Sequence, residues 1–342
     1  PDRPLGLFRR LPQARMNAPS IIRGRLAPSP TGFLHLGNAW AFLLAWLACR
    51  KDGGALILRM EDIDPDRSRT EYAEAIIRDL HWLGLDWDEG PDAGGPCGPY
   101  VQSARLSLYA DALDRLASEG HTYPCYCTRK ELRTLAGAPH VGDAGAAYPG
   151  TCRNLSPERR AELEAAGRRP CIRLRCPGDV YAFEDVVAGS LSTTLEACGG
   201  DFALRRSDGV VAYQLAVVVD DGLMGVTQVV RGEDLLVSTP RQLALFDLLG
   251  FRRPDYMHLP LLCDPEGERL AKRHAGLTLA SLRDAGVAPA AVVGYLGRKA
   301  GLLDAPAPVH PRDLLPAFAP ARLRALPARV RIEEGLADTL RT

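Results

Sequence analysis

Hydrophobic positions in the first part of the chain fall into blocks that predict a strand, a helix and a second strand. Residues 21–30 (IIRGRLAPSP) alternate and end in prolines, as does a strand that leaves a sheet. Residues 38–53 (NAWAFLLAWLACRKDG) are mostly apolar and end in glycine, which predicts a helix. Residues 55–64 (ALILRMEDID) form an apolar run that ends in acids, typical of a buried parallel strand. The β-α-β order predicts the beginning of a doubly wound parallel sheet in an α/β fold.

Two further helices are expected in the first third of the chain. Asp64 followed by Pro65 predicts the cap and first position of a helix that runs to about Gly84. Residues 107–120 (SLYADALDRLASEG) have the pattern of an amphipathic helix.

The alternation of strand and helix patterns then stops near residue 121 and resumes near residue 210, which predicts an inserted segment. Residues 121 to about 200 are rich first in cysteine, then in glycine and proline, then in arginine. Regular α/β alternation resumes over residues 210–236, and residues 239–250 (TPRQLALFDLLG) predict a helix. The predicted organisation is a flexible tail (1–20), the first half of a Rossmann-type domain (21–120), a cysteine-rich insertion (121–200), the second half of that domain (201–275) and a small helical C-terminal subdomain (276–342).

Composition limits the class of protein. The chain of 342 residues has a formal net charge of zero, which argues against coating nucleic acid by bulk charge but leaves a local basic face possible. It contains no run of about 18 apolar residues, so we expect no membrane span. Nine cysteines without an even framework favour a reducing compartment, and we expect a cytoplasmic monomer.

The loop between the first strand and helix has the composition of a phosphate site. A helix N-terminus offers free N–H groups and a positive dipole end, and Gly32 and Gly37 let the backbone approach a ligand. His35 and Asn38 are three positions apart, so both can face one bound group. A lone histidine in a turn is more often an ordinary polar residue. This alternative stays open as long as His35 is considered without the other segments.

Three other segments provide charges that would converge on this loop. The basic segment 267–276 (GERLAKRHAG) could clamp a triphosphate, although most basic loops are solvated. Glu61 follows a strand at the sheet end where doubly wound folds bind ligands. Arg231 follows another strand, and a guanidinium there could receive a carboxylate through a bidentate pair.

Several motifs together resemble the glutamyl branch of the class I aminoacyl-tRNA synthetases. RLAPSPTGFLHLGN (25–38) is similar to the "HIGH" signature of that class, and RLAKR (269–273) is similar to its "KMSKS" loop. MEDID (60–64), YQLAVVVDD (213–221) and VVRGEDLL (229–236) narrow the resemblance to the glutamyl branch.

The resemblance covers roughly residues 22–300 and includes two departures from the motifs. Asn38 stands where the second histidine is usual, and Ala271 stands where a serine is usual. Both bear on the rate of ATP activation, while the reaction class that the resemblance implies is unaffected.

That resemblance implies ATP- and Mg²⁺-dependent activation of L-glutamate to an adenylate. The glutamate-binding positions would be Arg25, Ala27, Pro28, Ser29, Glu61, Tyr213 and Arg231. The catalytic and ATP-binding positions would be His35, Gly37, Asn38 and Lys272. Glutamate carries two carboxylates and one ammonium group, so two arginines and one acid match its charges. The alternative for Glu61 is a helix-capping or salt-bridged acid.

The insertion contains a candidate metal site. Cys125, Cys127 and Cys152 are close enough in sequence to bind one tetrahedral ion through sulfur. A short branch of the family, the glutamyl-queuosine tRNA(Asp) synthetases, shares the Cys-x-Cys…Tyr-x-x-x-Cys pattern, which adds Tyr148 and implies one structural zinc per chain. Free buried cysteines are the alternative, and Cys171 and Cys176 are expected to be core thiols.

Length bears on which RNA is the partner. Only 70 residues follow Lys272, so we expect no large anticodon-binding domain. The short branch transfers glutamate to the queuosine base of tRNA(Asp), which implies an anticodon stem-loop as partner. The arginine-rich run 153–175 could contact phosphates, or it could be a solvated helix face. A truncated synthetase that charges a tRNA 3′ end and a non-catalytic binding paralogue remain as alternatives.

Overall fold

The computed structural model describes residues 9–10, 21–128, 130–132, 148–270 and 275–341. Within the predicted tail it describes only β1 (Arg9–Arg10), which pairs antiparallel with β7 (Gly189–Thr194). In the described part of the chain, no helix is long and apolar enough to cross a membrane.

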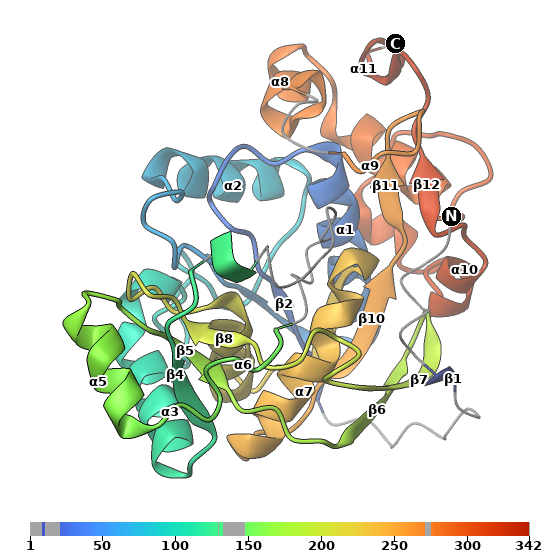
Figure 1. Cartoon of the computed structure of the whole chain (residues 1–342). Helices are drawn as coiled ribbons and strands as arrows, with labels where there is room; N and C mark the ends of the chain where they lie inside the picture. Colours follow the sequence, from blue (N-terminus) through green and yellow to red (C-terminus); the bar gives the residue numbers. More distant parts are fainter. Residues whose placement is uncertain (1–8, 11–20, 129, 133–147, 271–274, 342) are drawn as a thin grey trace.

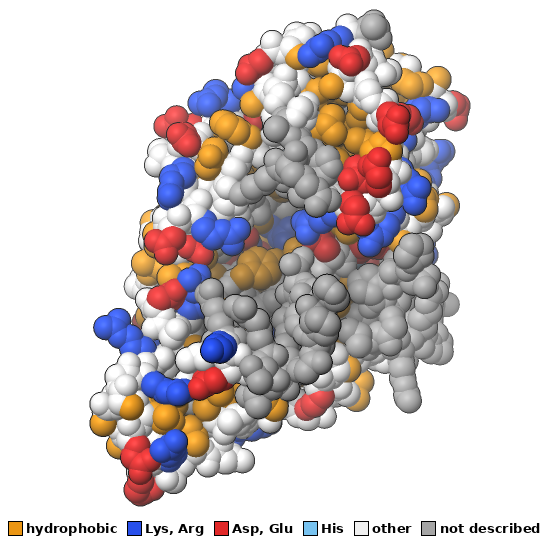
Figure 2. Space-filling view, turned by 45° about the horizontal axis from the view of Figure 1, so that its top comes forward, with side chains coloured by type: hydrophobic (Ala, Val, Ile, Leu, Met, Phe, Trp, Pro, Cys, Tyr) orange, Lys and Arg blue, Asp and Glu red, His pale blue; other side chains and the backbone are white. Residues whose placement is uncertain are grey.

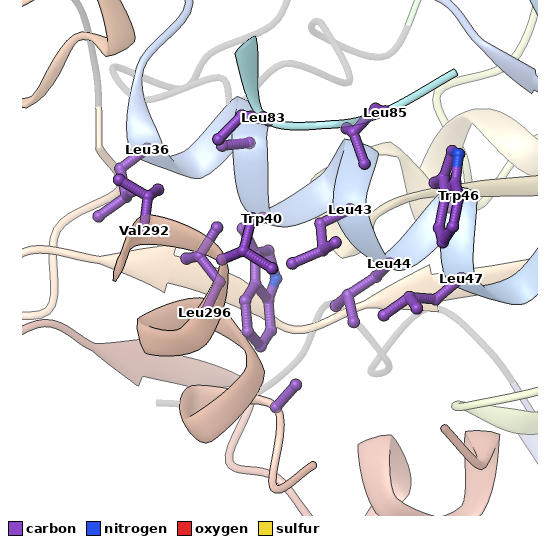
Figure 3. Packing of buried hydrophobic residues seen from close by; sticks show 14 of the residues in the cluster. Leu36, Trp40, Leu43, Leu44, Trp46, Leu47, Leu83, Leu85, Val292 and Leu296 are labelled. Carbon is purple, nitrogen blue, oxygen red and sulfur yellow. The ribbon is translucent and has the colours of Figure 1, made fainter. Parts of the chain in front are cut away.

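The expected β-α-β beginning is present. β2 (Arg23–Leu26) and β3 (Ala55–Leu58) pair in parallel, and α1 (Leu36–Lys51) connects them. Most of the side chains of α1 are buried, which explains why its sequence is apolar on every face rather than amphipathic. Figure 3 shows Trp40 and its neighbours on α1 packed near Val292 and Leu296 of α9 (Pro289–Lys299).

The helix predicted from Asp64 to Gly84 begins later than expected. The structure has a turn after Asp64, and α2 (Thr70–Trp82) starts six residues further on. The Asp64 carboxylate closes this turn, because one oxygen accepts the Asp66 N–H at 3.3 Å and the other pairs with Arg206 at 2.9 Å. Pro65 therefore belongs to a turn, and the prediction of a helix start at this position was wrong.

A mixed sheet forms the second half of the catalytic region. β6 (Val180–Asp185) and β7 form an antiparallel hairpin, while β10 (Asp255–Leu259) lies parallel to both β6 and β9 (Gln228–Gly232). The strand order is β1-β7-β6-β10-β9. The β6–β7 hairpin falls inside the range predicted as an insertion, yet it pairs with the catalytic strands.

A small antiparallel sheet lies at one end of the molecule and the C-terminal helices lie at the other (Figure 1). The small sheet has the order β4-β5-β8, from β4 (Thr122–Cys125), β5 (Cys171–Leu174) and β8 (Ala203–Arg205). The C-terminal part also contains a strand, β12 (Arg329–Arg331), which pairs in parallel with β11 (Leu261–Cys263). This pairing attaches the C-terminal part to the strand that follows β10.

The remaining helices include the two that the sequence pattern predicts over 107–120 and 239–250. They are α3 (Leu106–Ser118), α5 (Pro157–Ala165), α6 (Tyr213–Leu223), α7 (Thr239–Leu248), α8 (Leu279–Asp284), α10 (Pro320–Arg324) and α11 (Leu336–Thr339), with short 3-10 turns at η2 (Gln102–Ala104), η3 (Glu233–Ser238), η4 (Ala275–Leu277) and η5 (Pro311–Leu314). One hydrophobic cluster surrounds α1 and α9, and a second lies between α3, α6 and α7.

Candidate active site

The described residues that the sequence singled out line a single cleft of about 770 Å³. They come from the carboxyl ends of β2, β3 and β9 and from the N-termini of α1 and α6. The cleft brings together Arg25, Ala27, Pro28, Ser29, His35, Gly37, Asn38, Glu61, Tyr213 and Arg231.

Lys272 lies outside the described residues, but the segments on either side of it meet the cleft. Leu270 is buried and lines the cleft before the gap. After the gap, Thr278 forms a bridge with His35, and the Leu279 N–H donates to the Leu34 carbonyl at 2.8 Å.

The N-terminus of α1 is fixed by Asn38. Its Oδ1 accepts the backbone N–H of His35 at 3.0 Å, which caps the first turn. A Cβ at Gly37 would lie 3.1 Å from Cε1 and Nδ1 of His35, so a larger residue would crowd this ring. Both His35 and Asn38 line the cleft. The side-chain oxygen of Asn38 accepts a hydrogen bond in the cap.

Arg25 and Glu61 are joined by a buried ionic network centred on Arg59. The Arg59 guanidinium, fully buried, donates to Glu61 at 3.0 Å and to Asp221 at 2.7 Å. Asp221 also lies 3.7 Å from Nε of Arg25, whose Nη1 donates to the Val230 carbonyl at 3.1 Å. Opposite charges thereby alternate in a buried network, of which Arg25 and Glu61 line the cleft.

Burial and neighbouring charges shift the pKa values of Glu61 and Arg59 in this network. Burial raises the pKa of the Glu61 carboxyl, and the neighbouring charges of Arg59 and Arg25 oppose that rise. Burial disfavours the charged form of Arg59, but Asp221, Asp220 and Glu61 outweigh it and raise its pKa. An ammonium group placed beside Glu61 would favour its ionised form.

A second layer holds the network from behind. Asp220 accepts from Nε of Arg105 at 2.6 Å, from Gln102 at 2.8 Å and from the Tyr109 hydroxyl at 2.9 Å. Sequence reasoning did not assign these residues or Arg59. The adjacent acids within the apolar stretch of α6 were the available signal, because buried carboxylates need partners.

Arg231 occupies the facing wall of the cleft. Its Nη1 donates to Gln242 at 2.7 Å, its Nη2 donates to Thr239 at 2.8 Å, and its Nε donates to Nε2 of His258 at 3.1 Å. The guanidinium also lies 5.2 Å from the ring centroid of Tyr256. Arg231 is thus buried and fixed in orientation at the edge of the cleft.

The charges of the cleft suit a small amino acid with an acidic side chain. Arg25 and Arg231 offer N–H donors to carboxylates and Glu61 offers acceptors to an ammonium group, while Arg67, Arg269 and Asp234 also line the cleft. Burial also raises the pKa of the Tyr213 phenol, so its hydroxyl is protonated and able to donate.

A cysteine cluster beside β4 could hold a metal ion. The Sγ atoms of Cys125, Cys127 and Cys152 lie within 4.8 Å of one another. The Tyr148 hydroxyl lies 3.3 Å from the Cys125 Sγ and accepts the Cys152 N–H at 2.7 Å. Sulfur ligands of a tetrahedral zinc ion are about 3.8 Å apart, so this spacing fits such an ion.

The two other thiols of this region differ from each other. Cys176 is buried, as expected of a core thiol, and its N–H donates to Asp201. Cys171 is only half-buried and stands directly opposite Cys125 in the β4–β5 pairing, so the expectation of a core position was wrong for it.

Three arginines of the arginine-rich run form ion pairs. Arg159 pairs with Glu162 at 2.5 Å, Arg168 pairs with Glu131 at 3.0 Å, and Arg153 lies 3.6 Å from Asp201. On the face in Figure 2, lysine and arginine side chains are likewise interspersed with acidic ones. These arginines are therefore not an unopposed basic surface.

Comparison with known proteins identifies the family. Residues 21–303 match the family described as tRNA synthetases class I (E and Q), catalytic domain. The chain belongs to this class I synthetase family. The resemblance predicted from its motifs is thereby confirmed.

Two relatives of this synthetase are similar over almost their whole length. One, named glutamyl-Q tRNA(Asp) synthetase, from Nitratidesulfovibrio vulgaris, is 64% identical over 92% of this chain and 99% of its own. The other has the same name and comes from Symbiobacterium thermophilum; it is 56% identical over 92% of this chain and 97% of its own.

A solved structure extends the comparison to the fold. The glutamate-tRNA synthetase of Elizabethkingia anophelis superposes with a TM-score of 0.79 at 27% identity, over 94% of this chain and 70% of that one. The synthetase described here therefore has the class I synthetase fold.

Proposed function

We propose that the protein activates L-glutamate with ATP and Mg²⁺ and transfers it to the queuosine base at the wobble position of tRNA(Asp). The observation that carries the first step is the charge arrangement of the cleft, where Arg25 and Arg231 face Glu61. The identity of 64% to a protein named glutamyl-Q tRNA(Asp) synthetase supports the second step.

In the first step, the arginines would bind the side-chain carboxylate and Glu61 would bind the α-ammonium group. The α-carboxylate is then left to attack the α-phosphorus of ATP, and the P–O bond to pyrophosphate breaks. The N-terminus of α1, with His35 and Gly37, would hold phosphate oxygens through N–H groups and the helix dipole. Lys272 would stabilise the charge that develops on pyrophosphate.

In the second step, a hydroxyl of the queuosine ring would attack the activated carbonyl carbon. The new ester bond replaces the bond to the phosphate, AMP departs as the leaving group, and the hydroxyl proton is released to solvent. No described residue is assigned to the recognition of queuosine.

We further propose that zinc occupies the cysteine cluster, bound by Cys125, Cys127, Tyr148 and Cys152, as one structural ion per chain. Its role when bound would be to cross-link β4 to the segment around residue 150. The supporting observation is the proximity of the three thiols and the Tyr148 hydroxyl.

The strands that support the cleft would form a Rossmann-type sheet in the order β3-β2-β9-β10-β6. Parallel pairing of β2 with β3 and of β10 with β9 and β6 supports this arrangement. Two hydrogen bonds between Thr227 and Arg23 would join the halves, at 2.8 and 2.9 Å. A mainly helical C-terminal subdomain, a monomer and a cytoplasmic location complete the proposal.

One assay tests this function against its nearest alternative, the charging of a tRNA 3′ end, which the fold shared with a glutamate-tRNA synthetase favours. The protein is incubated with labelled glutamate, ATP and Mg²⁺, first without tRNA to measure glutamate-dependent pyrophosphate exchange. tRNA(Asp) with or without queuosine is then added, and the labelled nucleotide is located. Exchange without tRNA and label on queuosine are expected; label on the terminal adenosine would support the alternative, and no exchange would indicate a non-catalytic paralogue.

A further inference from the structure

Arg231 is held by side chains that do not themselves reach the cleft. An arginine side chain has five N–H donors. Three of them are bound among the described residues, by Gln242, Thr239 and His258. Two donors therefore remain. Because Arg231 is the one of these four residues that lines the cleft, these two donors are available to a ligand carboxylate.

The contacts of His258 determine which of its ring nitrogens carries the proton. Nε2 faces Nε–H of Arg231, which can only donate, so Nε2 must accept. Nδ1 lies 2.7 Å from Oδ2 of Asp185, which accepts, so Nδ1 must carry the hydrogen. The imidazole is therefore neutral in a single tautomer, in agreement with burial, which lowers the pKa of His258.

Asp185 is itself fixed at the end of β6. Its Oδ1 accepts the backbone N–H groups of Val187 at 2.9 Å and Ala188 at 2.7 Å. Its Oδ2 accepts both Nδ1–H of His258 and the His258 backbone N–H, the latter at 3.1 Å. Both oxygens of the carboxylate thus accept hydrogen bonds from N–H groups that face them.

We propose that Asp185 and His258 are positioning residues for amino-acid selection: they fix the orientation of Arg231 so that its two remaining N–H groups receive a carboxylate. The pair acts through Arg231 and touches no substrate. Because a guanidinium only donates, a ligand amide would place an N–H group against it, so a fixed Arg231 favours glutamate over glutamine. This inference rests on the proposed function, which assigns Arg231 to glutamate.

Asp185→Asn provides the most direct test. The amide oxygen would take the place of Oδ1, facing Val187 and Ala188, and its NH₂ group would face His258. Nδ1 would then have to accept, and the proton would move to Nε2, where it opposes the Nε–H of Arg231. We expect the KM for glutamate in pyrophosphate exchange to rise about tenfold or more, as for a lost hydrogen bond to a charged group, while the KM for ATP stays the same.

A matched control separates this effect from loss of stability. Asp79 is also a buried carboxylate paired with an arginine, Arg283, but it lies between α2 and α8, away from Arg231. Asp79→Asn should lower the melting temperature while leaving the KM for glutamate unchanged. An equal rise in that KM in both variants would overturn the inference.

Two substitutions of His258 test its contacts with Asp185 and Arg231 separately. His258→Gln places an acceptor near the position of Nε2, whereas His258→Asn keeps a donor near Nδ1 and leaves Arg231 without its acceptor. We expect the glutamate KM and the preference over glutamine to be closer to wild type in the glutamine variant. Equal values in the two variants would contradict a role through Arg231.

Thr239 gives a further comparison if the histidine variants do not fold. Its hydroxyl lies 2.8 Å from Nη2 of Arg231 and 3.1 Å from Nε2 of His258, so it joins the two side chains. Thr239→Val should raise the glutamate KM, and Thr239→Ser should restore it; no difference between them would count against the proposal. Failure of the wild-type protein to show glutamate-dependent exchange would instead refute the proposed function.

Discussion

Arg25, which we propose binds glutamate, is held in place by its neighbours before any ligand binds. Its guanidinium is buried, with Nη1 bound to the Val230 carbonyl and Nε facing Asp221. Arg59 holds Asp221 and Glu61 in turn. A buried charge without partners is costly, so this alternation offsets part of the cost of burying Arg25 and Glu61 before a ligand binds.

Replacing Arg25 should change which amino acid the cleft prefers. Arg25→Leu removes donors that only a carboxylate can pair with fully, so we expect kcat/KM for glutamate to fall about 10- to 100-fold. The much lower activity with glutamine should fall less, because an amide gains little from the guanidinium. Pyrophosphate exchange with each amino acid measures both values.

Arg23 offers a control on the same strand. It pairs with Glu89 at 2.7 Å and does not line the cleft. Arg23→Leu should leave the ratio of glutamate to glutamine activity as in the wild type. If Arg25→Leu lowered kcat/KM equally for glutamate and glutamine, the charge of Arg25 would not explain the preference for glutamate.

The sequence identified the residues of the cleft better than it identified their supports. Glu61 and Arg231 could be predicted because Glu61 follows β3 and Arg231 lies near the end of β9, both at the ligand-binding edge of a sheet. The bond between Arg59 and Asp221 joins residues 162 positions apart, and that between Asp185 and His258 joins residues 73 positions apart. No local spacing marks such pairs, because tertiary folding alone brings them together.

At the scale of elements, the strands and helices with strong apolar patterns were predictable and their boundaries were less so. α1, α3 and α7 agree with their apolar patterns. The start of α2 was misplaced because the Asp64 carboxylate closes a short turn, where it accepts the Asp66 N–H and pairs with Arg206. A local capping signal of about 1 kcal/mol does not distinguish such a turn from the start of a helix.

The cysteine cluster joins β4 to a loop, so the zinc ion that we propose there should stabilise this part of the protein. We expect purified protein to contain about one zinc per chain, measured by elemental analysis. Cys125→Ser or Cys152→Ser should release it and lower the unfolding temperature, because binding of a structural ion is coupled to folding.

A buried thiol elsewhere controls for the substitution itself. Cys49 lies on α1, and its Sγ donates to the Ala55 carbonyl at 3.3 Å, a bond that serine can also make. Cys49→Ser should retain zinc. Protein purified without chelators that contains no zinc would count directly against the site.

At the scale of the whole molecule, charge limits how RNA can bind. The formal net charge is zero, and acidic side chains accompany the basic ones on the face in Figure 2. Affinity for nucleic acid from bulk charge requires many unopposed phosphate contacts. Local contacts around the cleft must therefore select the RNA, which favours a compact element such as a stem-loop.

An isolated anticodon stem-loop of tRNA(Asp) should then suffice as acceptor. With queuosine at the wobble position it provides the hydroxyl that attacks the adenylate, so it should accept labelled glutamate from ATP and the protein. A stem-loop of the same sequence with guanosine at that position lacks the nucleophile and should accept none, although it presents the same phosphates. Because the stem-loop lacks the acceptor stem of tRNA, label on it cannot come from charging of the terminal adenosine. Labelling of full-length tRNA(Asp) at its 3′ end, with neither stem-loop labelled, would assign the protein to charging of tRNA instead.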